Sequence, residues 1–398
     1  QSTANYSSGA NRLIFNAAGL IAGLCEVNHP VTMEGLVLTG YIPGSDASAA
    51  GPAELLTVKN GADCYSYVGG LLVGSMFQTA GTSDNRLILG DVKAANCRLL
   101  TDTECHVGET PVCYYGCIAG NIKGVDIKPV SEQSVWDFGG CRIEVVSERL
   151  GKDSAVAGLT GRFTEAGTLE LPGRVLLPDM LVRSPDRSVF VGGILGNAAK
   201  RVTVASAAGN GSEVYLGSMT AEGCQNAGGL TAVLTDNTAF HGIRLIGRDA
   251  GAGIRSDGNV GAVAGSIKTS GPVENLSAQG FAVSGSGLAV DARTAAVGGF
   301  VGLLESGTVK NCYADVAVLS SGNAPAGGFA GRIDGGSISR CYASGTVTGR
   351  AQTGGFFGAI IKDGTVKSCY ATGDVFYDRS AAQVEAGAGG TGASELSV

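Results

Sequence analysis

Three consecutive segments near the C-terminal end repeat one another, and this repeat constrains the fold more than any other feature. They read GGFVGLLESGTVKNCYADVAV, GGFAGRIDGGSISRCYASGTV and GGFFGAIIKDGTVKSCYATGDV, and lie between Val297 and Tyr377. Their Gly-Gly pairs begin at Gly298, Gly327 and Gly354, which are 29 and 27 residues apart. A period of this size indicates one supersecondary unit per repeat, stacked so that each unit contacts only its neighbours.

The same Gly turn occurs upstream in a looser form that begins with Gly and an apolar residue. Together with the clear units it occurs ten times, at Gly19, Gly70, Gly116, Gly158, Gly193, Gly229, Gly261, Gly299, Gly328 and Gly355. The spacing falls from 51 residues between the first two to 27 between the last two. We therefore expect about ten coils that narrow toward the C-terminus, with longer sides or protruding loops in the early ones.

The residues within each unit favour β-strands. Each unit contains several Gly and is rich in Val, Thr, Tyr and Phe, which suit pleated surfaces better than helix interiors. From Cys312 to Val318 small or apolar residues alternate with others, the period of a half-buried strand. The odd offset between Val309 and Cys312 calls for a bend near Asn311. The chain is thus predicted to be an all-β parallel β-helix, or β-solenoid, and the usual sense of parallel crossovers predicts a right-handed coil.

Stacked coils place equivalent residues about 4.8 Å apart, so identical side chains form ladders along the axis. Cys312, Cys341 and Cys369 occupy equivalent positions, and we expect them to form an inward structural ladder of buried, reduced thiols. A disulfide between adjacent rungs is the alternative, because the Cα separation falls within disulfide range.

The residue after each of these cysteines is a tyrosine. If the cysteines face inward, Tyr313, Tyr342 and Tyr370 face outward as an aromatic row. Such a row is either a structural ladder or a ligand-binding surface that stacks on sugar rings or on another protein.

The composition excludes several classes of protein. Gly supplies 65 of the 398 residues without a collagen-like triplet period, and 44% hydrophobic against 16% charged residues argues against disorder. The net charge of -7 and the lack of Lys/Arg clusters argue against nucleic-acid binding. No uncharged apolar run approaches the roughly 20 residues that span a bilayer, so no membrane insertion is expected. Residues 1–10 are polar, so we expect any export signal to have been removed.

The C-terminal units resemble the GLUG repeat, which occurs in bacterial surface adhesins and large secreted proteins. The resemblance rests on the Gly-Gly turn and a following G-[TS]-[VI]-x-x-CYA pattern, in residues 298–302 with 307–314 and in residues 354–358 with 364–375. The first of these departs after Ala314, where Asp315 and Val316 replace a small residue and Gly. The resemblance implies a β-solenoid that is secreted or lies on the cell surface, and it brings no catalytic residues because the motif is structural.

Four regions follow from these patterns. Residues 1–16 are expected to be an N-terminal cap, residues 17–190 wide degenerate coils with loop insertions, residues 191–377 regular coils that include the clear repeats at 297–377, and residues 378–398 a linker or tail. Two segments depart from the repeat, at 97–117 and at 131–149, where Trp136 is the only tryptophan. We expect them to project as loops, which often carry the binding surfaces of solenoids.

The first of these segments contains possible metal ligands. Cys105, His106, Cys113 and Cys117 offer soft ligands, but structural zinc sites usually have two tight Cys/His pairs at a defined separation. Buried thiols are favoured over a disulfide between Cys105 and Cys113, and both over zinc, because Cys117 falls within a Gly turn. The calcium loop and the phosphate loop are missing, so neither a metal nor a cofactor is expected.

Paired carboxylates are the strongest enzymatic alternative, because glycosidases need two acids across one groove. Asp179 and Asp186, with Arg183 and Arg187, are the candidates, although a solvated loop between coils is the favoured interpretation. Nucleophilic catalysis is not expected, because no histidine stands near an activated Ser or Cys motif. The histidines are His29, His106 and His241.

These observations favour a non-enzymatic extracellular adhesin or surface-scaffold segment. It is expected to bind a host or bacterial surface glycan or protein along one face, or to self-assemble end to end through its exposed strand edges into a homopolymer. The alternative is a carbohydrate-active β-helix enzyme, a polysaccharide lyase or glycosidase. A trimeric viral fibre is the third hypothesis.

Overall fold

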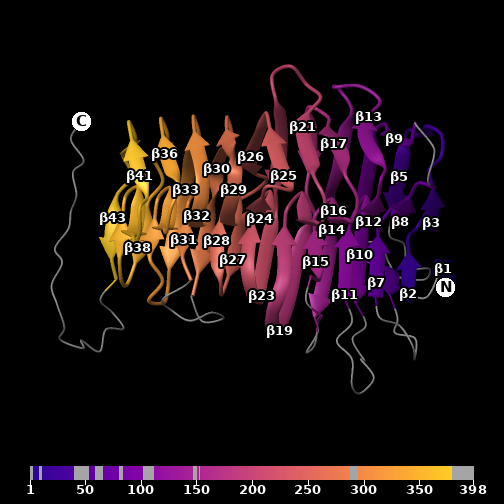
Figure 1. Cartoon of the computed structure of the whole chain (residues 1–398), viewed down its shortest axis with the longest axis horizontal. Helices are drawn as coiled ribbons and strands as arrows, with labels where there is room; N and C mark the ends of the chain where they lie inside the picture. The colour runs from indigo at the N-terminus through magenta and orange to yellow at the C-terminus, as the bar shows by residue number, and fades with distance from the viewer. Residues whose placement is uncertain are drawn as a thin grey trace.

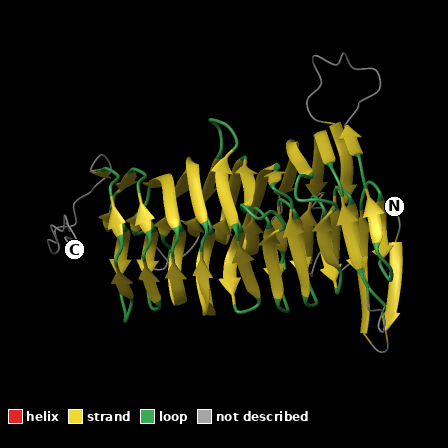
Figure 2. Ribbon diagram, turned by 90° about the horizontal axis from the view of Figure 1, so that it is seen from above, coloured by secondary structure: helices red, strands yellow, loops and turns green. Residues whose placement is uncertain are grey.

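The computed structural model describes residues 3–8, 11–39, 53–58, 66–79, 84–101, 112–146, 150–151, 153–286 and 295–378. All regular secondary structure in these residues is β-strand, and the strands are stacked along one long axis with the first described strands at one end and the last at the other (Figure 1). Figure 2 shows the same stack from above, with strands of successive coils side by side. The predicted all-β parallel β-solenoid is confirmed.

One sheet counts the coils, because ten of its twelve strands follow one another along the axis, one from each coil. We call it sheet 2 and number the coils 1 to 10 by its strands. In order they are β3 (Ala22–Glu26), β8 (Val73–Phe77), β12 (Ala119–Lys123), β16 (Thr160–Phe163), β20 (Leu195–Ala198), β24 (Thr231–Thr235), β29 (Ala264–Glu274), β32 (Val301–Lys310), β35 (Ala330–Ile333) and β40 (Phe357–Ile360). Each strand begins two or three residues after one of the ten Gly turns, so the loose turn pattern located every coil in the described chain.

The Gly turns are needed because neighbouring coils approach closely there. A Cβ atom on Gly299 would lie 1.9 Å from the carbonyl oxygen of Gly328, and one on Gly328 would lie 2.1 Å from that of Gly355. The backbone continues the ladder through the turn, since Phe300 N donates to Phe329 O at 2.8 Å and Phe329 N donates to Phe356 O at 2.8 Å. A side chain at these positions would separate the coils.

The cross-section changes along the axis, as the falling spacing predicts. Coils 1 to 6 have a separate sheet 3, formed by β4 (Val31–Met33), β9 (Arg86–Leu89), β13 (Asp126–Pro129), β17 (Gly167–Leu171), β21 (Val202–Ser206) and β25 (Thr238–His241). In coils 7 and 8 the long strands β29 and β32 extend through the following stretch instead. In coils 9 and 10 separate strands take the place of the second part of these long strands. They are β36 (Ser337–Ser339), which pairs with the second part of β32, and β41 (Thr365–Lys367), which pairs with β36; both belong to sheet 2.

Sheet 1 forms the remaining surface of the solenoid and contains 25 strands. They are β1 (Thr3–Ser8), β2 (Asn11–Ala18), β5 (Leu36–Thr39), β6 (Ala53–Val58), β7 (Ser66–Gly70), β10 (Val92–Thr101), β11 (Val112–Gly116), β14 (Val135–Val146), β15 (Ala155–Ala157), β18 (Arg174–Leu176), β19 (Asp179–Gly192), β22 (Ser212–Leu216), β23 (Ser218–Gly228), β26 (Ile243–Gly247), β27 (Gly253–Ser256), β28 (Asn259–Gly261), β30 (Ser277–Gly285), β31 (Val297–Gly298), β33 (Tyr313–Ser320), β34 (Ala326–Gly327), β37 (Tyr342–Ala343), β38 (Val347–Gly349), β39 (Thr353–Gly354), β42 (Tyr370–Ala371) and β43 (Val375–Tyr377).

The N-terminal end departs from the parallel pattern. Strand β1 pairs with β2 in the antiparallel direction, from Thr3 opposite Asn16 to Ser8 opposite Asn11. Strand β2 in turn pairs with β7 in parallel. An extra strand therefore lies along the first edge of sheet 1, within the region for which the sequence predicts a cap. Residues 379–398 of the predicted tail lie outside the described residues.

One corner of the coil is fixed by residues in the left-handed region. The φ angles of Asn275, Asn311, Arg340 and Ser368 are 59°, 54°, 53° and 53°, and the last three lie at the bend predicted between Val309 and Cys312 and between its equivalents. Asn is among the non-Gly residues that adopt this region most readily. The left-handed residue bends the backbone, so that residues an odd number of positions apart, such as Val309 and Cys312, both face the interior.

The prediction of a projecting loop at residues 131–149 is wrong for residues 135–146. Residues Val135 to Val146 form the strand β14, and Trp136 and Phe138 are fully buried in alternation with more exposed residues. Trp136 Nε1 donates to the carbonyl oxygen of Gly90 at 3.1 Å, so its polar group is also satisfied. The aromatic residues fill the wider early coils, which explains why the only tryptophan occurs there.

Candidate functional site

The three tyrosines of the repeats stack on the outer side of sheet 1. Tyr313 is opposite Tyr342 in the strand register, and Tyr342 is opposite Tyr370. The ring centroids are 4.1 Å apart in the first pair and 5.1 Å apart in the second. We call these residues the tyrosine row; Tyr313 and Tyr342 are partly exposed and Tyr370 is 55% exposed.

Stacking restricts how this row can contact a ligand. Because Tyr342 lies between the other two rings, both of its faces are covered. Sugars stack on open ring faces, and those remain only at the two ends of the row. One is the outer face of Tyr370; the other belongs to Tyr313, whose partner in coil 7 is the small Ser277. Along the rest of the row, the ring edges and hydroxyl groups face outward.

The Tyr313 hydroxyl is tied to the polar residues beside the row. Burial raises the pKa of Tyr313 to about 12, and hydrogen bonds with Tyr342 and Asp315 act in the same direction, against a hydrogen bond with Ser344. The phenol is therefore neutral at physiological pH and keeps its proton for hydrogen bonding.

A groove of about 490 Å³ lies directly beside the tyrosine row. Its lining includes the carboxylates of Asp249 and Asp315, the hydroxyls of Ser344 and Thr346, and the ring of Phe281. Asp315 and Ser344 each follow a row tyrosine by two residues and both influence the pKa of Tyr313, so the row and the groove are continuous. We call the two together the acidic aromatic face. Carboxylates accept hydrogen bonds in pairs, as sugar hydroxyl groups require.

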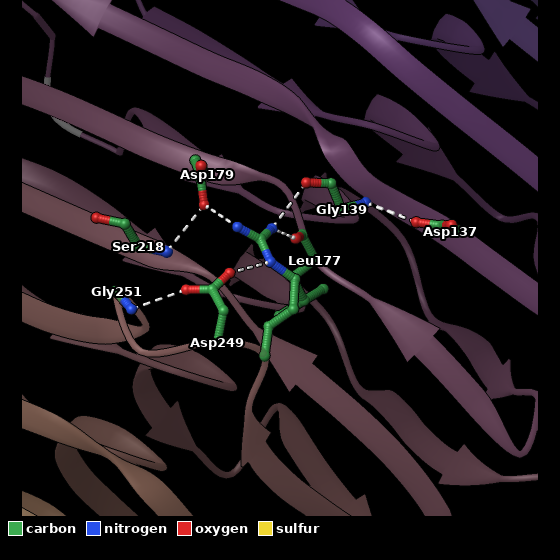
Figure 3. A network of polar contacts seen from close by, with 8 residues as sticks. Asp137, Gly139, Leu177, Asp179, Ser218, Asp249 and Gly251 are labelled. Atoms are coloured by element: carbon green, nitrogen blue, oxygen red, sulfur yellow. Dashed lines mark hydrogen bonds and ion pairs between the residues drawn. The ribbon is translucent and has the colours of Figure 1, made fainter.

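Asp249 of this groove is hydrogen-bonded to Arg248, whose other partners include Gly139, Leu177 and Asp179 (Figure 3). The Arg248 guanidinium donates to the carbonyl oxygen of Gly139 at 2.8 Å, to that of Leu177 at 3.0 Å and to Asp179 Oδ1 at 2.8 Å. Its Nε donates to Asp249 Oδ2 at 2.9 Å. The side chain is only 17% exposed and joins coils 3, 4 and 6.

The same network holds the carboxylate of Asp249 in place and in its ionised form. Asp249 accepts a second hydrogen bond from the backbone N of Gly251 at 2.8 Å, and the bond from Arg248 is the main cause that holds the pKa of Asp249 below its usual value. Asp249 is therefore ionised at neutral pH and can serve as an acceptor in the groove.

The carboxylate pair predicted for the enzymatic alternative does not converge. Asp179 is engaged by Arg248 and by the backbone N of Ser218 at 2.9 Å. The regular stretch from Asp179 to Arg183 alone spans about 13 Å, more than the roughly 5 to 10 Å between paired carboxyl groups of glycosidases, and Asp186 lies further along the strand beyond a register shift.

The favoured interpretation of this stretch as a loop is also wrong, because it belongs to the 14-residue strand β19. Met180, Val182 and Ser184 point inward and are buried, while Arg183 forms an ion pair with Glu222 at 2.6 Å. The side chains of Asp186 and Arg187 lie outside the described residues.

The cysteines of the repeats line up inside the solenoid. Cys312 and Cys341 are buried and Cys369 is partly buried, and all three are free cysteines. Each thiol donates to the carbonyl oxygen two residues before it, at 3.2 to 3.3 Å. A hydrogen bond with Cys312 is the main cause that raises the pKa of Cys341 to about 12. A thiol with this pKa is a poor nucleophile at neutral pH.

The early cysteines are also part of the core. Cys97, Cys113, Cys117 and Cys141 are buried, and a hydrogen bond with Cys97 is the main cause that raises the pKa of Cys141. The described part of the chain contains no group of three or more His, Cys, Asp or Glu side chains that could hold a metal ion. Cys105 and His106 lie outside the described residues, and His29 and His241 are exposed in coils 1 and 6.

Sequence reasoning missed a second aromatic stack, which lies in the interior. The rings of Phe300 and Phe329 are 4.6 Å apart and nearly parallel, and those of Phe329 and Phe356 are 4.9 Å apart with an interplanar angle of 1°. Each Phe directly follows a Gly-Gly pair, so the repeat alignment already carried the signal.

Comparison with known proteins supports the repeat assignment. The family model of the GLUG motif matches residues 294–319 and 322–348, which cover most of coils 8 and 9. The third repeat, in coil 10, follows these ranges. No curated protein and no solved structure matches the chain significantly. In the part of the chain that the structure describes, no helix has the length and apolar character to cross a membrane. The chain is therefore a β-solenoid repeat protein that carries the GLUG motif.

Proposed function

We propose that this chain is a non-enzymatic adhesive segment of a bacterial protein that is secreted or displayed on the cell surface. The GLUG motif in coils 8 and 9 and the elongated solenoid support this role. A solenoid holds its side chains on a stiff, regular surface, and it can place a binding face far from its point of attachment. The acidic aromatic face is the binding face of this proposal.

The observation that carries the proposal is that Asp315 and Ser344 belong to both parts of this face. They line the groove and each follow a row tyrosine by two residues, which places acceptors and donors beside open ring surface. This combination suits a glycan, whose hydroxyl groups need hydrogen-bond partners and whose C–H faces pack on aromatic rings. Because only the end rings have open faces, we expect hydrogen bonds in the groove to contribute most of the affinity.

The proposal does not include catalysis. Its support is the position of Asp179, which is neutralised by Arg248 and held away from Asp186 by the strand. Hydrolysis by two acids needs carboxyl groups on opposite sides of one bond. The groove itself has Asp249 engaged by Arg248, so this carboxylate is an acceptor and not a proton donor at neutral pH.

A glycan array tests the proposal with conservative variants. Asp315→Asn and Ser344→Ala keep the size of the side chain or reduce it slightly, and together they remove acceptors and a donor from the groove. Loss of two hydrogen bonds of about 1 kcal/mol each should reduce retention by at least about tenfold. Tyr215→Ala is the matched control, because Tyr215 is another outward tyrosine of sheet 1, located in coil 5.

The outcome decides between ligand classes. Retention on glycans that falls in the groove variants and persists in the control supports the proposal. Equal retention of all variants, or binding confined to proteins on the same surface, contradicts it. Circular dichroism of each variant shows whether the solenoid is intact.

A further inference from the structure

Coil 10 exposes inward-facing side chains whose partners in coil 9 are buried. Val347 in coil 9 is fully buried, whereas its partner Val375 in coil 10 is 46% exposed. Ile333 is likewise fully buried, whereas its partner Ile360 is 38% exposed. Partly buried residues that pack on the core occur only in coils 1 and 10 of the described chain, which identifies the two ends as its open faces.

The backbone of coil 10 is open on the same side. Strands β40, β41, β42 and β43 pair only with coil 9 within the described residues. Tyr370 N donates to Cys341 O at 3.3 Å and Thr372 N donates to Ala343 O at 3.0 Å. Because successive residues of a parallel strand direct their groups to opposite neighbours, the N–H and C=O of Ala371 point away from coil 9.

We propose that this C-terminal face binds one further β-coil of GLUG type, supplied by a partner polypeptide. The interface would repeat the contact that each coil already makes with the next. Each exposed residue of coil 10 therefore indicates which type of residue the added coil should place next to it. Tyr370 is 55% exposed and has a ring neighbour on one side only, so an aromatic ring can cover its other face as in the existing stack. The added coil should place aliphatic residues next to Val366 and Val375, and a small apolar residue next to Cys369. This is parallel strand addition with side-chain columns that set specificity.

Residues 379–398 of the chain itself do not match this pattern. They contain no Phe, Tyr, Cys or Ile. Strand addition by this stretch would leave the aromatic column without a partner.

The N-terminal face of a second copy is also a poor fit. Strand β2 lies in the same series of sheet 1 strands as β39, and β1 covers its edge. In a head-to-tail stack β1 would occupy the space between β39 and the next β2, which separates the copies by about one strand spacing of 4.8 Å. Strands β40 and β3 have no extra strand between them to fill that gap. The hairpin therefore opposes the end-to-end homopolymer that the sequence suggested, in the way that edge protection blocks strand pairing.

Hydrogen exchange of the full chain with a synthetic peptide tests the proposal. The peptide has the sequence of residues 350–378, which is one complete unit. Binding should slow exchange at least about tenfold for amides on the open side of β40 to β43, such as that of Ala371, and leave coils 4 to 6 unchanged. A control peptide with Asp in place of the residues equivalent to Phe356, Val366 and Val375 should give no protection.

Two adjacent receptor variants supply the matched control. Val375→Lys places a charge in the inward column and should abolish peptide protection, whereas Phe376→Lys places the same charge outside and should preserve it. Ala371→Pro removes an N–H from the open side and leaves every bond to coil 9 in place, so it separates edge pairing from any loss of fold.

Each outcome has a defined meaning. Peptide protection that is lost in Val375→Lys and Ala371→Pro supports the proposal. No protection at millimolar peptide overturns it. Dimers in light scattering that protect the same amides without peptide identify a second copy as the occupant, which also overturns it. Glycan retention on the acidic aromatic face is a separate measurement and does not depend on this result.

Discussion

The guanidinium of Arg248 in coil 6 donates a 2.8 Å hydrogen bond to the carboxylate of Asp179 in coil 4 (Figure 3). The same side chain reaches the carbonyl oxygen of Gly139 in coil 3, so one residue joins coils that are widely separated in sequence. A solenoid is otherwise held by nearest-neighbour contacts. Arg248 therefore couples coils that would open independently.

We predict that Arg248→Ala destabilises the middle of the solenoid. The substitution leaves Asp179 without its cation and two carbonyl groups without a donor, at a cost of about 2–4 kcal/mol. Hydrogen exchange of coils 3 to 6 should accelerate together. Arg244→Ala is the control, since its pair with Glu213 is largely exposed and should contribute less than about 1 kcal/mol. Equal effects of the two substitutions would contradict the clamp.

A second prediction concerns the Gly turns. Gly299→Ala places a Cβ atom 1.9 Å from the carbonyl oxygen of Gly328 and must separate coils 8 and 9. We expect a loss of about 1–3 kcal/mol in the free energy of unfolding. Gly209→Ala is the matched control, because a Cβ atom there has no neighbour within 4 Å. Denaturant titration of both variants measures the difference, and a neutral Gly299→Ala would show that close approach is not what the turn requires.

The interior phenylalanine stack gives a third prediction. Phe329 lies between two rings, whereas Phe356 has a ring on one side only. Phe329→Ala should therefore cost about 3–5 kcal/mol, and Phe356→Ala clearly less. The unfolding free energies of the two variants provide the test. The reverse order would contradict a stack in which the middle ring makes more contacts than the last one.

The thiol ladder gives a prediction on pH. The pKa of Cys341 is raised from 9.0 to about 12 in the folded chain, so the folded state holds this proton more strongly than the unfolded state. Its contribution to stability is complete below about pH 9 and is lost as pH rises toward 12. Thermal unfolding of the wild type should thus decline more steeply in this window than that of Cys341→Ala. Parallel curves would show that Cys341 does not contribute.

The repeat pattern predicted the fold because it records the contacts themselves. Each Gly turn marks a place where two backbones touch, so ten turns located ten coils even where the rest of the unit has diverged. The bend at Asn311 was predicted because Val309 and Cys312 are an odd number of residues apart. The structure confirms it with a left-handed residue in three successive coils. The register of Cys312 and Tyr313 with their equivalents follows from the same alignment.

Other features were not readable because they depend on distant residues. The sequence around Asp179 favours a solvated loop, yet the residues from Asp179 to Gly192 form a strand that pairs with β23 despite a register shift. The contacts of Arg248 span 71 and 109 residues and have no repeat to reveal them. The tyrosine row was predicted, but not that stacking covers the faces of its middle ring.

The in-register stacking of coils is tested most directly by distances along one column of sheet 1. Arg174 in coil 4 shares this column with Tyr313, Tyr342 and Tyr370 in coils 8, 9 and 10. Spin labels carried on noncanonical residues at Arg174 and at each tyrosine should lie about 19, 24 and 29 Å apart, which is one strand spacing more for each coil. Distances that do not increase by about 4.8 Å per coil would contradict the stack.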